Sequence, residues 1–145
     1  MNKIRAKTIR EAISKIKEEK REIIIHIEDP ETRPLTTPTE EKKIIKTYYK
    51  EILDNKDLKY KINKIIRKLK REGEVTEEIT ETACTPTYLL KLSIKEGRIK
   101  ATINTSKDNT KEEICNIIIF TQIMQEDLAL STGYNTGPIK IRIPK

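Results

Sequence analysis

The chain has 145 residues, of which 35% are hydrophobic and 37% charged, with a formal net charge of +7. This length suits a single domain, residues 1–145, that buries its core without disulfides or metals, and the composition excludes an intrinsically disordered chain. No stretch reaches the ~20 apolar residues of a membrane span, and the N-terminus lacks the apolar core of a secretory signal. We therefore expect a cytoplasmic protein whose two cysteines, Cys84 and Cys115, are free thiols.

The first forty residues predict a helix, a strand and a linker. Isoleucines at positions 4, 9, 13 and 16 fall mostly on one side of a helix over residues 3–20. The β-branched run "REIIIHIED" favours a buried strand at 22–28. Prolines at 30, 34 and 38 keep the chain extended, so 29–38 should be a linker or arm.

Two helices with a short turn between them should follow the linker. A Thr37 to Glu40 capping box, with Pro38 at the first helical position, predicts a helix that runs to about Asp54. The sequence "DNKD" then turns the chain into a second helix over about 57–71. Its apolar residues fall within about 100° of arc, as an amphipathic helix requires; they are Leu58, Ile62, Ile65, Ile66 and Leu69.

The last part of the chain predicts a hairpin, a buried helix and a final strand. Alternating apolar and polar residues flank Glu96-Gly97, so we expect a hairpin over 88–104. A capping box at Thr110 opens an almost wholly apolar helix, and "GPIKIRIPK" alternates as a strand does. The predicted fold is α+β, in the order α-β-α-α-β-β-α-β, with an antiparallel sheet of three to five strands packed by the buried C-terminal helix.

The 57–71 helix carries most of the excess positive charge. Residues 56–71 contain eight lysines and arginines and one acid, Asp57, so this stretch alone has a charge of +7. Like charges four residues apart repel each other in a helix, so a compensating partner is expected. The partner could be internal, the acids of 72–81 folding back; it could be nucleic-acid phosphate; or it could be an acidic protein or membrane surface. The lack of Trp and Phe on the apolar face argues against a membrane.

The order of elements is similar in outline to a winged helix-turn-helix, with 40–54 and 57–71 as the helix pair and 88–104 as the wing. The similarity covers the order of elements only. The polar sides of the hairpin and of the last strand are also basic, and they would form a second basic surface if those strands adjoin. That surface lacks the aromatic residues that stack bases, which favours contact with the nucleic-acid backbone.

The sequence gives less support to an enzymatic function. His26 is the only histidine, which excludes a His-based metal cluster in one chain, and we expect it to be a packed core residue. Cys84 could be a nucleophile with His26 as its base, but no local signature accompanies it. Acidic pairs such as Glu77-Glu78 could hold a divalent cation, yet such pairs are ordinary among 23 acids. We predict no catalytic residues, metal or cofactor.

The sequence therefore predicts a small, basic, non-catalytic nucleic-acid-binding protein that favours DNA over RNA. The alternative is a protein-interaction module, a regulator or inhibitor that sets the basic helix against an acidic partner or a second copy of itself. The Lys, Glu and Ile bias is shared by thermophiles and by organisms with AT-rich genomes. The residues expected to contact nucleic acid are Tyr60, Lys61, Lys64, Arg67, Lys68, Arg71, Lys91, Lys95, Arg98, Lys100, Lys140 and Arg142.

Overall fold

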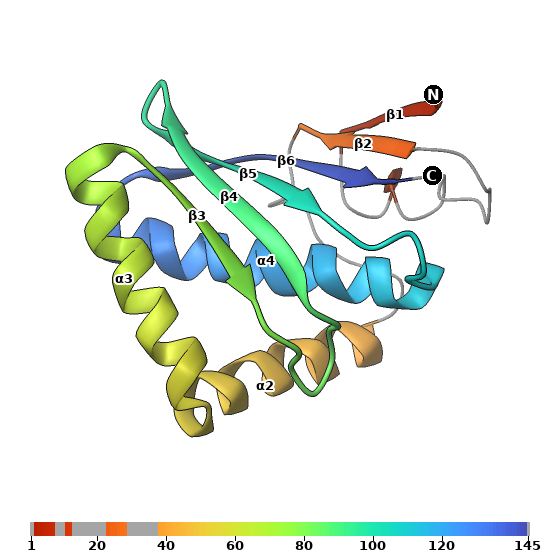
Figure 1. Cartoon of the computed structure of the whole chain (residues 1–145), viewed down its shortest axis with the longest axis horizontal. Helices are drawn as coiled ribbons and strands as arrows, with labels where there is room; N and C mark the ends of the chain where they lie inside the picture. The colour runs from red at the N-terminus through yellow and green to blue at the C-terminus, as the bar shows by residue number, and fades with distance from the viewer. Residues whose placement is uncertain (1, 8–10, 13–22, 29–37, 145) are drawn as a thin grey trace.

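The computed structural model describes residues 2–7, 11–12, 23–28 and 38–144 (Figure 1). The helices in these ranges are α2 (Pro38–Asp54), α3 (Lys56–Glu72) and α4 (Lys111–Thr132). The strands in the same ranges are β1 (Asn2–Ala6), β2 (Ile23–Ile27), β3 (Glu74–Ile79), β4 (Tyr88–Lys95), β5 (Arg98–Asn104) and β6 (Asn135–Ile143). The predictions of a strand near 22–28, of the two helices before the hairpin, of the hairpin itself and of the last helix and strand are thus confirmed.

The strands form one mixed sheet in the order β1-β2-β6-β5-β4-β3. β1 pairs with β2 in parallel, and so does β5 with β6, whereas the other neighbours are antiparallel. The α+β class is confirmed, but the prediction of an antiparallel sheet of three to five strands is wrong. The difference has a topological cause: α4 carries the chain from β5 to β6, and such a crossover returns the next strand parallel to the first.

Two strands were missed from the sequence. Residues 2–6, predicted as the start of a helix, form β1, in which Ala6 is buried while Lys3 and Arg5 are exposed. Residues 11–12 are helical, whereas residues 8–10 and 13–20 of the predicted helix lie outside the described residues, as does the linker over 29–37. The acidic segment after α3 forms β3, where Val75 and Ile79 turn towards the core.

The three helices lie on the same side of the sheet, and the core lies between the two layers (Figure 1). α4 is buried on most of its circumference, which explains why its sequence shows so little polar face. Ile117, Ile118 and Ile123 of α4 are buried in the same cluster as Leu92, Ile99 and Ile141 of the sheet. The predicted core around the last helix is therefore confirmed, with Ile94 packed against it and half-buried.

A β-bulge interrupts the pairing of β5 with β6 between Ile99 and Ala101. Gly137 lies in this bulge, and a side chain there would come within 2.6 Å of the Ile99 carbonyl oxygen. The buried Gln125 of α4 compensates for the broken ladder, because its Nε2 donates to the carbonyl oxygens of Ile99 at 2.9 Å and of Gly137 at 3.2 Å. The bulge thereby sets where Lys100 stands relative to β6.

Candidate nucleic-acid interface

Helix α3 begins and ends as its sequence indicates. The Asn55 side chain caps the N-terminus by accepting a hydrogen bond from the Leu58 backbone N–H, and Gly73 ends the helix with a left-handed φ of 75°. Leu58, Ile65 and Leu69 are buried against the sheet and the other helices. The basic residues are therefore left on the remaining circumference, as the helical projection predicts.

Strand β3 supplies partners to two of these basic residues. Lys64 Nζ lies 2.8 Å from a carboxylate oxygen of Glu77, whose side chain is only 12% exposed because it points to the helix side of the sheet. This hydrogen bond, with the attraction of the Glu77 charge, raises the pKa of Lys64. Lys61 Nζ donates to the Glu78 backbone carbonyl at 2.7 Å and lies 3.4 Å from Asp57. Part of the charge of α3 is thus compensated within the chain.

The remaining predicted residues of α3 face solvent to different degrees. The Tyr60 side chain is exposed, as are Arg67 and Arg71, while Lys68 is half-buried. Arg71 lies 3.8 Å from Glu72, which is also exposed, and such an exposed ion pair contributes little to stability in water. Within the described part of the chain, the side chains of Arg67 and Lys68 make no hydrogen bond or ion pair.

The sheet face turned away from the helices, here called the open face, is a second basic surface. In one row across the sheet, Arg5, His26 and Lys140 are neighbours on β1, β2 and β6, and Thr102 and Lys91 continue the row on β5 and β4. The next row joins Lys3, Ile24, Arg142, Asn104 and Leu89 in the same strand order. Because side chains two residues apart in a strand share a face, both rows point to the same side.

Three further predicted cations belong to the hairpin end of this face. Lys100 pairs with Ser93 in the register, and Lys95 pairs with Arg98 beside the turn. The Arg98 guanidinium donates from Nε to the Thr136 backbone carbonyl at 3.0 Å, which fixes it over the start of β6. The predicted hairpin and last-strand residues therefore lie on one surface, since β5 and β6 are direct neighbours.

Lys3, Arg5 and His26 are open-face residues that the sequence reasoning did not assign. Lys3 and Arg5 were placed in a helix, although the alternation in "NKIRA" could have indicated a strand. His26 was expected in the core, but it alternates with the buried Ile25 and Ile27 and so stands half-buried on the open face. The expectation of a packed core histidine is therefore wrong.

The likeness to a winged helix-turn-helix does not extend to the arrangement in space. β4 and β5 are flanked by β3 on one side and β6 on the other, so the hairpin occupies the interior of the sheet. α3 packs on that sheet through its apolar face. Both outer edges of the hairpin are therefore paired within the sheet.

The proposed pairing of Cys84 with His26 is contradicted by their positions. Cys84 lies in the β3–β4 loop, which contacts α2 on the helix side, whereas His26 stands on the open face. Burial is the main cause that raises the pKa of the Cys84 thiol, so the neutral thiol is favoured there. Neither cysteine forms a disulfide. Glu77 and Glu78 point to opposite sides of β3, and the described residues include no group of three potential metal ligands.

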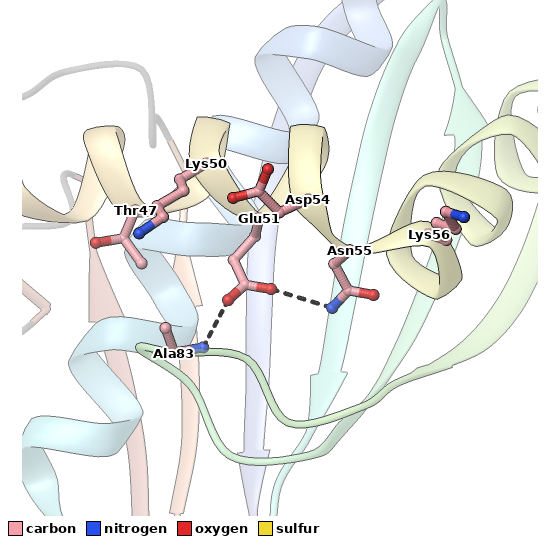
Figure 2. A pocket seen from close by; sticks show the side chains of 7 residues that line it. All are labelled: Thr47, Lys50, Glu51, Asp54, Asn55, Lys56 and Ala83. Atoms are coloured by element: carbon pink, nitrogen blue, oxygen red, sulfur yellow. Dashed lines mark hydrogen bonds between the residues drawn. The ribbon is translucent and has the colours of Figure 1, made fainter.

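A hollow of about 580 Å³ lies where α2, α3 and the β3–β4 loop meet (Figure 2). The Glu51 carboxylate stands between the loop and the turn: it accepts from the Ala83 backbone N–H at 3.0 Å and from Asn55 Nδ2 at 3.0 Å. The lining mixes both signs of charge, since Lys50 and Lys56 stand beside Glu51 and Asp54. The Glu51 carboxylate thus holds the β3–β4 loop against α2 and α3, so a structural role explains its position.

The chain matches no known family model and no curated protein. Among the described residues, no helix is long and apolar enough to cross a bilayer.

Proposed function

We propose that the protein binds nucleic acid non-catalytically through the open face of its sheet, with DNA as the favoured partner. The observation that supports this most is the accumulation of positive charge from β1, β6, β5 and β4 on one surface. Of the acids on that surface, Glu74 and Glu78 lie on the edge strand β3, and Glu28 follows β2. Its cations are Lys3, Arg5, Lys91, Lys95, Arg98, Lys100, Lys140 and Arg142.

The chemistry of the open face favours the nucleic-acid backbone over the bases. Lys and Arg that meet phosphates release condensed counterions, and this gain does not depend on sequence. Proteins that bind single-stranded nucleic acid stack the bases on aromatic side chains. On the described part of the open face, His26 is the one aromatic ring. A duplex backbone therefore suits the surface better than a single strand.

Helix α3 then has a secondary role in this proposal. Lys61 and Lys64 already have partners within the chain, and the acidic strand β3 separates α3 from the open face. Arg67, Lys68 and Arg71 are the predicted α3 cations that could still reach a phosphate beyond that edge.

A salt-titrated binding assay with a 5′-hydroxyl DNA duplex tests the proposal. The double variant Lys91→Gln/Lys95→Gln should lower the magnitude of the slope of log K against log salt by about 1.8, which is 0.9 for each lost contact. Lys42→Gln/Lys46→Gln is the matched control, because it removes the same charge from exposed positions of α2. Equal slopes for the two variants would refute binding through the open face, and a duplex RNA arm tests the preference for DNA.

A protein-interaction role remains the second candidate, and one observation favours it. Leu53 of α2 is 78% exposed and Leu130 of α4 is 86% exposed, and each lies one turn beyond a pair, Tyr49 and Asp127, that joins the two helices. Exposed apolar side chains are often contact sites when they cluster. A stoichiometric protein complex that survives nuclease and is lost in Leu53→Ser/Leu130→Ser would favour this role over nucleic-acid binding.

A further inference from the structure

The open face is hollowed where β1, β2, β6 and β5 lie side by side. The hollow has a volume of about 390 Å³, near the lower end of the range for small-ligand sites. Apart from the aliphatic Ile4 and Ile24, its lining is charged or titratable and comes from all four strands; these residues are Lys3, Arg5, His26, Glu28, Lys100 and Lys140. Such a lining suits a compact anion.

The strand register brings these groups within reach of one ligand. Arg5 is the direct partner of His26, which is in turn the direct partner of Lys140. Lys100 is two residues from Thr102, the partner of Lys140 on β5. Neighbouring strands are about 4.8 Å apart, so long cationic side chains from three strands converge over His26.

The hollow has an excess of positive charge that the described residues do not compensate. Beside Arg5, three lysines line it, and Glu28 is the one carboxylate among the lining residues, so the lysines exceed it by two charges. Within the described part of the chain, the side chains of Lys3, Lys100 and Lys140 make no hydrogen bond or ion pair. Cations gathered around one hollow repel each other, and a bound anion would offset that repulsion.

The pKa of His26 responds to the charges that line the hollow. Burial lowers its pKa, and the charges of Lys100, Arg5 and Lys140 lower it further, while Glu28 acts in the opposite direction. An anion among these cations would favour the protonated ring, which would then donate one more hydrogen bond to it.

We infer that the hollow binds a phosphate monoester, either the terminal phosphate of a nucleic-acid strand or the phosphate of a free nucleotide. A monoester carries about −1.5 to −2 charges at pH 7 and three strong acceptor oxygens, whereas each backbone diester carries one charge. Three lysines beside one carboxylate match the charge of the monoester better, and each ammonium group can donate hydrogen bonds to its oxygens. Binding of the terminal phosphate of a strand rests on the proposed function, whereas binding of a free nucleotide does not.

The first test compares one duplex with a 5′-phosphate or a 5′-hydroxyl end. The terminal phosphate should raise the affinity of the parent protein about tenfold or more, a gain of about 1.4 kcal/mol. Lys100→Gln/Lys140→Gln should lose that gain. Lys91→Gln/Lys95→Gln, on the same face but outside the hollow, should bind both duplexes more weakly and keep the ratio between them. An equal gain in both variants would overturn the inference.

The second test uses the parent protein, so it does not depend on the variants folding. NMR titration of the His26 ring, with inorganic phosphate or a nucleoside monophosphate added, should show its pKa raised towards or above the ordinary value. A raised pKa with no gain from the terminal phosphate supports the site with a free nucleotide as the source. An unchanged pKa together with no gain refutes the site. Salt-dependent binding of the hydroxyl-ended duplex would then still support the proposed function, whereas phosphate binding without duplex binding would refute that function alone.

Discussion

Replacing Gly137 by Ala tests how the bulge between β5 and β6 is built. The added methyl would lie 2.6 Å from the Ile99 carbonyl oxygen and 2.9 Å from its carbon, where ordinary contact begins at 3.4 Å. Both are backbone atoms that cannot rotate away, so the strands must separate by roughly 0.8 Å. Overpacking of this kind costs about 1 to 3 kcal/mol, or about 2 to 12 °C in Tm at this chain length.

The sign of the change makes this experiment decisive. Without a clash, Gly→Ala would stabilise the protein by about 0.4 to 1 kcal/mol, because it restricts the unfolded chain. Urea unfolding measures the free energy, and hydrogen exchange of the β5 and β6 amides locates the damage. Gly133→Ala is the control: it meets nothing within 4 Å, strains only the end of α4 and should leave exchange at the bulge unchanged. A Gly137→Ala protein as stable as the parent, or more so, would refute the close approach.

Three other predictions concern the core, the charge of α3 and the response to pH. Ile118→Ala should cost about 2 to 5 kcal/mol in urea unfolding, because Ile118 is fully buried, whereas Leu130→Ala should stay within about 0.5 kcal/mol; a loss under about 1 kcal/mol at Ile118 would place it outside the core. Glu77→Gln should lower the urea midpoint by removing the partner of Lys64, while Glu78→Gln, exposed on the opposite side of the same strand, should not; equal midpoints would contradict the pairing. The folded-state pKa of His26 is lowered, so the unfolded chain takes up this proton first and stability falls as pH drops below about 6.5. In His26→Gln, the decline between roughly pH 7 and pH 5.5 should be shallower, and an identical pH profile would contradict that shift.

Local signals in the sequence were sufficient for much of the fold. The Thr110 and Glu113 capping box forms as predicted, with both reciprocal hydrogen bonds present, and Gly73 ends α3 in the left-handed conformation. The hairpin turn also follows its sequence, since Gly97 has a positive φ and Glu96 shares it. These features depend on residues a few positions apart, which is why the sequence alone indicates them.

The features that were missed depend on distant parts of the chain. Glu77 interrupts the apolar alternation of β3, and its place on the helix side is tolerable only because α3 brings Lys64 to it. Ile4 fits a helical spacing with the isoleucines after it, so β1 is recognisable only once β2 lies beside it. The parallel pairing of β5 with β6 depends on where α4 returns the chain.

The candidate site also has features that nearby residues predict and features that depend on distant parts of the chain. The alternation of Lys91, Lys100 and Lys140 with apolar residues correctly indicates a one-sided basic sheet. Strand order, which alternation does not encode, brings Lys140 beside His26 and Arg5. The compensation of Lys61 and Lys64 likewise needed the position of β3.

An NMR titration with a short DNA duplex at low salt tests the central claim most directly. The account predicts that amide and side-chain signals from β4, β5 and β6 on the open face shift together, and that the shifts recede as salt is added. Signals from α2 should stay in place, and those from α3 should move less. Shifts confined to α3, or no shifts at low salt, would contradict nucleic-acid binding by the open face.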